Sequence, residues 1–303
     1  MRIVKLKGGL GNQMFQYAFA KVLEKNTGDT AKLDFSAYKS LNGDMIRVPR
    51  IKKFNIVLET ANEKDLRSIL KFRHEGNSLS LKYKAGILAE NLFNRKYYFE
   101  RNRAYVPLES IKDYKYYDGY WQSFKYVDDV FDEISKEFSV KPGSLSSSTK
   151  NTMKTMDEQN SVFVGVRKGD YTADKKSMNH YGNFDSVYYK SAMDYISARV
   201  DNPVFYVFSN DIPWCKDNID WGNNAIVYRE PEEQTDDFEE LILMSSCKHA
   251  VIVNSTYHWW GAKLIKNPDK IVCCPQKWFF DNAPIDIVPD NWVKIDSKGN
   301  IYE

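Results

Sequence analysis

Cationic and hydroxyl side chains follow strand-like segments in the second half of the chain, and such groups can bind phosphates. The string VGVRKGDY, residues 164–171, carries Arg167, Lys168 and Asp170 directly after a β-rich run. A guanidinium can hold a diphosphate through two hydrogen bonds and can stabilise negative charge that develops on a leaving group. The alternative is a surface ion pair between Arg167 and Asp170, which contributes little. The position after a strand favours binding, because ligands of parallel sheets lie beyond the carboxyl ends of the strands.

Two later strand-like segments end in the same way. The string VFSND contains Ser209 and Asp211, and the string IVNSTYHWWGAKL contains Asn254, Ser255 and Thr256 where a helix would begin. Hydroxyl groups beside the N–H groups of a helix start can form an anion site. Alternatively, Ser255 or Thr256 only caps the helix.

The string GGLGNQ at residues 8–13 lies between a short strand and a helix and is a third candidate. A glycine-rich turn before a helix presents backbone N–H groups to an anionic or sugar-phosphate ligand. Gly11 could also belong to a dinucleotide fingerprint with Asp34 as its acid, but Met14 is too bulky for the close packing of that motif. A tight turn without a ligand is the structural alternative. Asn12 and Gln13 favour binding, because their amides can reach the hydroxyl groups of a ligand.

The histidines and acids show no metal-binding pattern. No two of the four histidines are four residues apart, and no Asp-x-Asp pair suits a divalent ion. We therefore predict neither a metal site nor a cofactor. Cationic side chains must then neutralise any bound diphosphate.

Strands and helices alternate along the chain and would position these residues. A strand over 2–6, a helix from residue 13 and a strand ending at Asp34 predict a βαβ unit. After Pro142, Gly143 and a serine cluster, the alternation restarts and continues to about residue 275. This order favours parallel, doubly wound sheets of the α/β class. We predict two domains, residues 1–140 and 141–303.

Composition and charge limit the class of protein. The chain of 303 residues has 43% hydrophobic and 28% charged residues and no apolar run long enough for a membrane span, so a cytoplasmic protein is expected. Residues 1–150 carry 27 basic and 18 acidic residues, a net charge of +9, and residues 151–303 carry 16 and 23, a net charge of −7. The densest basic stretch, residues 64–103, has ten bases and four acids. It could contact an anionic membrane surface or nucleic acid, or be an ordinary solvated face.

The strings GGLGNQMFQYAFA, VRKGDY, FSND and NSTYHWWGAKL, in this order and spacing, closely resemble the bacterial α-1,2-fucosyltransferases of glycosyltransferase family eleven. The resemblance covers about residues 3–275. It implies a GT-B architecture, with two Rossmann-like domains facing each other across a cleft. The second domain would bind GDP-L-fucose, and the first would contribute to the acceptor side. The reaction would be an inverting, metal-independent transfer to the 2-hydroxyl of a galactoside in a surface glycan.

The resemblance also implies roles for single residues. Arg167 and Asp170 match the first arginine and the aspartate of the family's H-x-R-R-x-D pattern, in which the arginine contacts the sugar-nucleotide phosphates. Ser255 and Thr256 fall where phosphate contacts are expected, and Glu240 falls where relatives carry an aspartate that recognises guanine. Arg167 and Asp170 are the predicted catalytic residues. The predicted nucleotide-sugar site comprises Arg167, Glu240, Ser255 and Thr256 with Gly11, Asn12, Gln13, Ser209, Asp211 and Asn254. Two departures are Gly165 in place of the histidine and Lys168 in place of the second arginine, which keeps the charge without the planar fork.

Several points stay open at this stage. The base could be Asp170 or His180, or the reaction could need none, because GDP is an excellent leaving group. The acceptor could be a galactose-terminated oligosaccharide or a lipid-linked glycan, and in the second case residues 64–103 could hold the enzyme at the inner membrane face. No nucleic acid partner is expected. The alternatives are an NAD-dependent oxidoreductase, another nucleotide-sugar glycosyltransferase, or a non-catalytic glycan-binding module.

Overall fold

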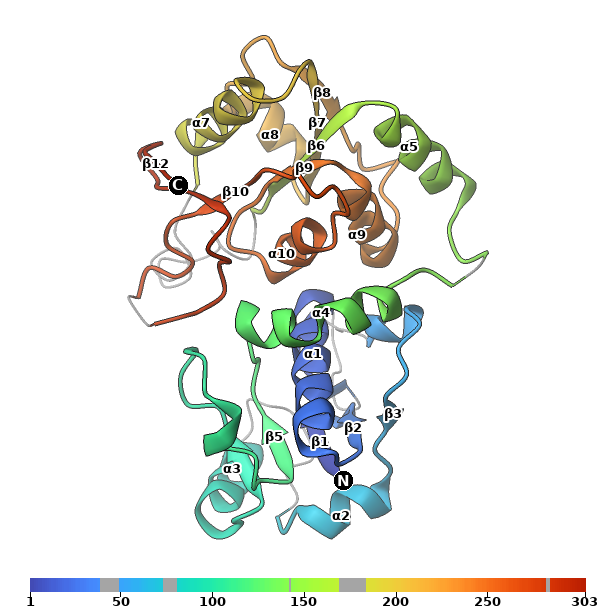
Figure 1. Ribbon diagram of the computed structural model, residues 1–303, viewed down its shortest axis with the longest axis vertical. Helices are drawn as coiled ribbons and strands as arrows, with labels where there is room; N and C mark the ends of the chain where they lie inside the picture. The colour runs from blue at the N-terminus through green and yellow to red at the C-terminus, as the bar shows by residue number, and fades with distance from the viewer. Residues whose placement is uncertain (39–48, 73–80, 142, 169–183, 282–283) are drawn as a thin grey trace. The chain divides into compact units, whose positions relative to one another are not determined.

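The chain forms two compact units, which we describe separately. The computed structural model describes residues 1–38, 49–72, 81–141, 143–168, 184–281 and 284–303 (Figure 1). Unit 1 comprises Met1–Lys141 and Pro284–Ile287, and unit 2 comprises Pro142–Ala283 and Val288–Glu303. Asp286 ties the returning segment to unit 1, because its carbonyl accepts from the Phe124 N–H (2.8 Å) and its carboxylate accepts from the Lys125 ammonium (2.7 Å).

Unit 1 is built on a parallel sheet of five strands in the order β3-β2-β1-β5-β4. Its strands are β1 (Arg2–Lys5), β2 (Ala31–Asp34), β3 (Glu59–Thr60), β4 (Tyr97–Phe99) and β5 (Tyr116–Asp118). Its helices are α1 (Leu10–Thr27), α2 (Glu63–Ile69), α3 (Leu81–Phe93) and α4 (Phe124–Glu137), with short 3-10 turns at Ser36–Tyr38, Arg50–Lys53 and Leu108–Ser110.

Helix α1 is the central helix of unit 1. Every residue from Gln13 to Leu23 is buried, because α1 packs against β1, β2 and α4. The helix begins at Leu10, three residues earlier than the sequence pattern predicted. It ends at Thr27, and the following Gly28 adopts a left-handed conformation (φ 67°) and donates its N–H to the Glu24 carbonyl. Such a C-terminal cap suits glycine because no Cβ opposes a positive φ.

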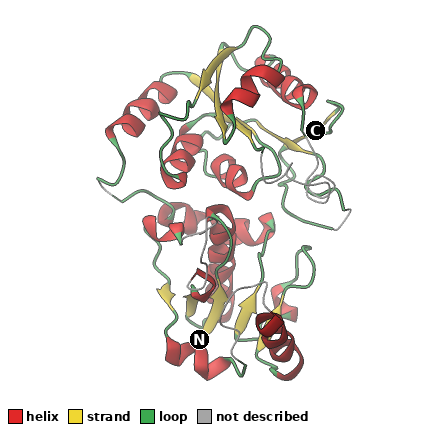
Figure 2. Cartoon of the chain, turned by 180° about the vertical axis from the view of Figure 1, so that it is seen from behind, coloured by secondary structure: helices red, strands yellow, loops and turns green. Residues whose placement is uncertain are grey.

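Unit 2 is built on a sheet of seven strands in the order β12-β11-β10-β9-β6-β7-β8, parallel except for β12. Its strands are β6 (Asn160–Val166), β7 (Pro203–Ser209), β8 (Ala225–Tyr228), β9 (His249–Val251), β10 (Val272–Pro275), β11 (Val293–Ile295) and β12 (Ile301–Tyr302). Its helices are α5 (Ser147–Asp157), α7 (Ser186–Ser197), α8 (Ile212–Asn218), α9 (Asp237–Ser246) and α10 (Thr256–Lys263). Figure 2 shows that each unit contains both helices and strands.

The predicted α/β class, with a parallel sheet in each half of the chain, is confirmed. In unit 2, Val166 pairs with Ser209 and Val164 with Val251, so the residues after β6, β7 and β9 lie at one edge. In unit 1, Lys5 pairs with Asp34 in the same way. We call these the carboxyl edges of the two sheets. Among the described residues, no helix is both long and apolar enough to cross a membrane.

Candidate functional site

Arg167 lies at the carboxyl edge of unit 2, immediately after β6. The backbone beside it is fixed by Asn210, whose carbonyl oxygen accepts from the Lys168 N–H (3.0 Å) and whose amide donates to the Lys168 carbonyl (2.8 Å). This reciprocal pair joins the residues that follow β6 to those that follow β7. The loop that presents the half-buried Arg167 is therefore anchored at its base.

Lys168 points into unit 2 and has a different environment from Arg167. Its side chain is buried, and its ammonium lies 3.4 Å from the centroid of the Trp214 ring and donates to the Phe184 carbonyl (3.3 Å). Burial lowers the pKa of Lys168. These contacts give Lys168 a structural role between β6 and α8, whatever else it binds.

Gly165 and His258 form a close pair at this edge. A Cβ atom on Gly165 would lie 2.5 Å from Nδ1 of His258, so the imidazole of α10 occupies the space that a side chain on β6 would fill. His258 is buried, and its pKa is lowered to about 3, first by burial and then by the charge of Arg167. A neutral imidazole therefore lies near Arg167. Gly165 replaces the family's histidine, and His258 from another element, which was not predicted, lies against it.

The start of α10 provides further groups at the same edge. Ser255 is buried and precedes the helix, and its side chain makes no capping hydrogen bond. Ser255 therefore occupies the N-cap position of α10 without capping the helix through its side chain. Asn254 is buried and donates to the Trp278 carbonyl (3.0 Å), which fixes the turn before the helix. Thr256 is the first residue of α10, so its N–H belongs to the positive end of the helix dipole.

The predicted acids of unit 2 bind groups of their own unit. Asp211 accepts from the Trp214 N–H (3.0 Å) and caps α8, and the Ser209 hydroxyl accepts from the Asp211 N–H (3.0 Å). Glu240 Oε1 accepts from Arg229 (2.9 Å) and from the Thr235 N–H (3.0 Å). These contacts hold the loops that follow β7 and β8. The remaining candidates, Asp170 and His180, lie outside the described residues.

The GGLGNQ loop of unit 1 is a closed turn. Gly8 has a φ of 82°, and a Cβ there would lie 2.5 Å from the Asn12 amide nitrogen. Gln13 is fully buried, donates to the Gly8 carbonyl (3.1 Å) and accepts from the Ile51 N–H (3.0 Å). Gly11 is buried in the first turn of α1. Asn12 is only partly buried and accepts from Gln122 (2.9 Å), so it lies beside the segment that follows β5.

Asp118, which sequence reasoning did not identify, is the central charge at the carboxyl edge of unit 1. It is buried and binds Lys5 (3.0 Å), Lys7 (2.6 Å) and the Tyr97 hydroxyl (3.0 Å). Burial alone would raise the pKa of Asp118, but the two ammonium groups outweigh it, and the pKa lies well below the usual range. Asp34 is also buried and accepts from the Tyr116 hydroxyl (2.5 Å).

Glu100 stabilises an unusual backbone conformation at Trp121, beside the cluster of Asp118, Lys5 and Lys7. Its carboxylate accepts from the N–H groups of Tyr120 (2.6 Å) and Trp121 (3.1 Å), and Trp121 has a φ of 56°. Burial raises the pKa of Glu100, although these hydrogen bonds and the charge of Lys7 oppose the shift. A positive φ on a bulky residue is strained and persists only where its surroundings enforce it. Asp118 and Trp121 lie in the string DGYWQ, residues 118–122, which was not identified as a motif in the sequence.

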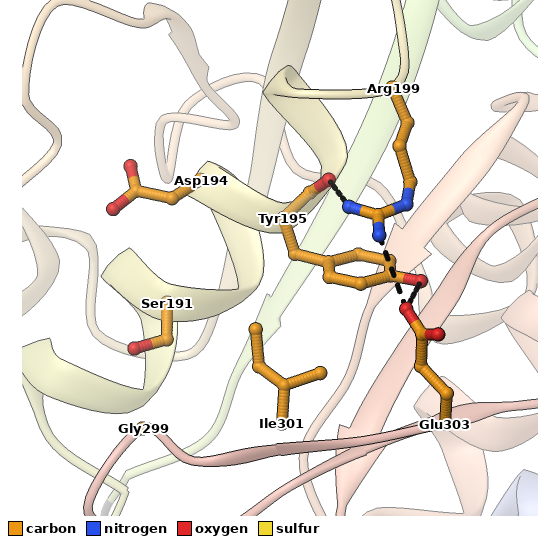
Figure 3. Close-up of a pocket in the computed structure, with 7 residues that line it drawn as sticks. All are labelled: Ser191, Asp194, Tyr195, Arg199, Gly299, Ile301 and Glu303. Atoms are coloured by element: carbon orange, nitrogen blue, oxygen red, sulfur yellow. Dashed lines mark hydrogen bonds and ion pairs between the residues drawn. The ribbon is translucent and has the colours of Figure 1, made fainter.

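A pocket in unit 2 lies apart from the candidate residues (Figure 3). Its lining residues are Ser191, Asp194, Tyr195, Arg199, Gly299, Ile301 and Glu303. Arg199 lies 3.7 Å from the Tyr195 ring centroid and pairs with Glu303 (3.2 Å), which also accepts from the Tyr195 hydroxyl (2.7 Å). These groups interact with one another through hydrogen bonds and an ion pair, and they connect the α7 region to the last residues of the chain. Across the part of the chain that the structure describes, no cluster of His, Cys, Asp or Glu could hold a metal ion.

Comparisons with known proteins identify the family of the chain. The sequence pattern described as Glycosyl transferase family 11 matches residues 1–296. The chain is 31% identical over 304 residues to an alpha-1,2-colitosyltransferase of Escherichia coli, which covers 97% of this chain and 98% of that protein. It is 30% identical over 306 residues to the O-antigen biosynthesis glycosyltransferase WbnK of Escherichia coli, with 96% and 99% covered.

More distant relatives are similar over less of their length or at lower identity. The galactoside 2-alpha-L-fucosyltransferase SEC1 of Bos taurus is 24% identical over 266 residues, covering 86% of this chain and 63% of that protein. The crystal structure of fucosyltransferase NodZ from Bradyrhizobium aligns with a TM-score of 0.42 and 11% identity, over 86% of this chain and 90% of that chain. A likeness at that level carries no weight for function. The match of one family pattern to nearly the whole chain excludes the NAD-dependent oxidoreductase: the protein is a glycosyltransferase and belongs to glycosyltransferase family 11.

Proposed function

We propose that the protein transfers L-fucose from GDP-L-fucose to the 2-hydroxyl of a galactoside in a surface glycan, with inversion and without a metal ion. The observation that carries the proposal is the group at the carboxyl edge of unit 2, where Arg167, the neutral His258 and the start of α10 come together. A guanidinium and helix N–H groups suit a diphosphate. The family assignment supplies the reaction class.

The donor would bind unit 2 through its diphosphate and its guanine. Arg167 would pair with the phosphates, and the Ser255 and Thr256 turn would direct hydroxyl and N–H groups to them. Without the donor, His258 is uncharged at neutral pH, because burial and Arg167 lower its pKa to about 3. Glu240 would accept from the guanine N1–H through Oε2, since Oε1 already binds Arg229 and Thr235.

The chemical step would be a direct displacement at the anomeric carbon of fucose. The acceptor oxygen forms the new bond as the bond to the β-phosphate oxygen breaks, so negative charge grows on GDP. Arg167 and the α10 start would stabilise that charge. The acceptor proton would pass to Asp170, to His180 or to water.

The acceptor would be a galactose-terminated oligosaccharide or a lipid-linked glycan bound by unit 1. Support comes from the segment after β5, where Tyr120 is 42% exposed and Gln122 pairs with Asn12 (2.9 Å). An exposed aromatic face beside amide groups suits a sugar ring, whose C–H groups pack on the aromatic face while its hydroxyl groups bind amides.

A second donor deserves a direct test because of one relative. The alpha-1,2-colitosyltransferase is 31% identical over 97% of this chain. Colitose lacks the 3-hydroxyl of fucose, so both sugars could use the same phosphate contacts. Discrimination would then depend on whether a polar group of this chain binds that hydroxyl.

The test is a transfer assay with GDP-fucose and GDP-colitose against an array of β-galactosides, with the linkage read by NMR. We expect an α-1,2 linkage to galactose with GDP-fucose as the better donor. Arg167→Ala should lower turnover about 10²–10³-fold, as expected for the loss of one preorganised charge contact. Arg199→Ala, in the pocket of Figure 3, is the matched control and should leave turnover unchanged. Transfer with another linkage, or full activity of Arg167→Ala, would overturn the assignment.

A further inference from the structure

Helix α3 in unit 1 carries an apolar stripe on its exposed face. Leu81, Ala85, Leu88 and Leu92 follow one another at intervals of four, three and four residues, which places them on one side of a helix. The three leucines are 86%, 59% and 65% exposed. Figure 1 shows α3 at the periphery of unit 1. A contiguous apolar surface of this kind is unusual for a face that meets only water.

The opposite face of α3 is attached to unit 1 by polar contacts. Glu90 and Asn94 are both buried, Asn94 donates to Glu90 (2.7 Å) and to the Ile69 carbonyl (2.8 Å), and Lys71 donates to the Phe93 carbonyl at the helix end (3.1 Å). Glu90 lies about half a turn from Leu88, at about 100° per residue. The body of the unit therefore fixes the inner face, and the leucine stripe faces outward.

The described segments that flank the stripe carry mostly exposed bases. Within residues 63–72 and 84–103, Glu63 is the exposed acid and pairs with Arg67 (3.9 Å), whereas Glu90 is buried and Asp65 and Glu100 are only partly exposed. The exposed bases are Lys64, Arg67, Lys71, Lys84, Arg95, Lys96 and Arg101. At the end of the helix, the rings of Phe72 (38% exposed) and Phe93 (65% exposed) lie 6.2 Å apart. The leucine and phenylalanine side chains are thus flanked in the sequence by more exposed bases than exposed acids.

We propose that α3 docks unit 1 on an anionic lipid surface, with the leucine stripe among the acyl chains and the bases at the headgroups. A helix with an apolar face and Lys or Arg at its borders binds membranes in the interfacial plane. The charge argues against a second copy of this chain as the occupant, because two such surfaces would bring like charges together. A nucleic acid is also a less suitable occupant. Its phosphate backbone would bind the bases and would leave the exposed leucines without a function.

The proposal is tested by flotation of the full-length protein with phosphatidylglycerol-containing vesicles and with pure phosphatidylcholine vesicles. We expect binding to the anionic vesicles, and a loss of about tenfold or more when salt rises from about 0.05 to about 0.5 M. Leu88→Gln/Leu92→Gln should weaken binding at least about tenfold, because two apolar side chains are lost. Lys84→Gln/Arg95→Gln should weaken it by a similar factor and should reduce the salt dependence.

Two matched controls change similar side chains elsewhere. Val57→Gln alters another exposed apolar residue of unit 1 (63% exposed), and Lys150→Gln alters an exposed base on α5 of unit 2. Both should bind anionic vesicles like the natural protein. Transfer to a soluble galactoside by all four variants reports that they are folded, and the vesicle readout itself does not depend on the donor or acceptor.

Four results would overturn the proposal. The first two are equal binding to neutral and anionic vesicles, and no binding to either. The third is a concentration-dependent dimer in light scattering that Leu88→Gln/Leu92→Gln abolishes, which would assign the stripe to a second copy. Equal loss of vesicle binding in the Val57→Gln control would also contradict it, because the effect would then not belong to α3.

Discussion

At the carboxyl edge of unit 1 the charged side chains bind one another, whereas at the carboxyl edge of unit 2 Arg167 lies beside a neutral histidine. Lys5 and Lys7 both pair with Asp118, which is 1% exposed. In unit 2, Asp211 caps a helix and Glu240 binds Arg229, and burial together with Arg167 keeps His258 uncharged. Both edges occupy the position where parallel sheets bind ligands.

Under the proposed function, the two edges would bind two kinds of ligand. An internally neutralised edge holds its loops rigidly and suits an uncharged sugar. An edge with a guanidinium and a helix start suits an anion. The following experiments would break or sharpen this contrast, beginning with the largest expected effect.

Removing the buried charge of unit 1 should cost stability. Asp118→Asn leaves Lys5 and Lys7 without their carboxylate, and breaking a buried pair in this way costs about 3–5 kcal/mol. The matched control is Asp113→Asn at an exposed position nearby, which should change little. Hydrogen exchange of β1 and β5 peptides measures the loss. Equal protection in the two variants would show that the edge of unit 1 does not depend on its ion cluster.

The packing of Gly165 against His258 predicts the next effect. Gly165→Ala places a methyl group 2.5 Å from the imidazole and should cost about 1–3 kcal/mol as overpacking. Adding His258→Ala provides room, so the double variant should recover part of the loss, with a coupling of about 0.5–3 kcal/mol. Urea unfolding of the four proteins gives the cycle. Additive effects would mean that the ring is not in contact with Gly165.

The lowered pKa of His258 predicts how stability changes with pH. Between its ordinary value of about 6.5 and its folded value of about 3, the unfolded state binds more protons than the folded state. The stability due to His258 is therefore present above about pH 6.5 and is lost as the pH falls, by about 1.4 kcal/mol per pH unit. His258→Asn should remove this slope. Parallel stability curves for the natural protein and the variant would show that the fold does not lower the pKa of His258.

The carboxyl edge of unit 2 could be predicted from the sequence, whereas that of unit 1 could be predicted only in part. The difference depends on the lengths of the strands. The long strands of unit 2 are nearly continuous runs of apolar residues, so β6 and β7 were predicted from the sequence and the edge that carries Arg167 followed from them. The strands β3, β4 and β5 have two or three residues each, too few for a period to emerge. Asp118 ends one of them and was therefore missed.

The pairing of Gly165 with His258 could not be predicted, because it depends on side-chain packing between residues 93 positions apart in the sequence. The roles of Asp211 and Glu240 are a similar case. Their residue types fit a nucleotide site, and only the geometry places them on the Trp214 N–H and on Arg229. Residue type and position after a strand thus predict which side chains lie at the carboxyl edge of a sheet. Their hydrogen-bond partners show which of these side chains stabilise the loops.

Titration of GDP by isothermal calorimetry into the natural protein, Arg167→Ala and Lys7→Gln tests the central claim most directly. Both substitutions remove one positive charge, from unit 2 and from unit 1 respectively. We predict that Arg167→Ala weakens GDP binding about 10–100-fold, as expected for charge-assisted hydrogen bonds, and that Lys7→Gln leaves the affinity unchanged. Weakened binding in Lys7→Gln with normal affinity in Arg167→Ala would contradict the assignment of the donor to unit 2.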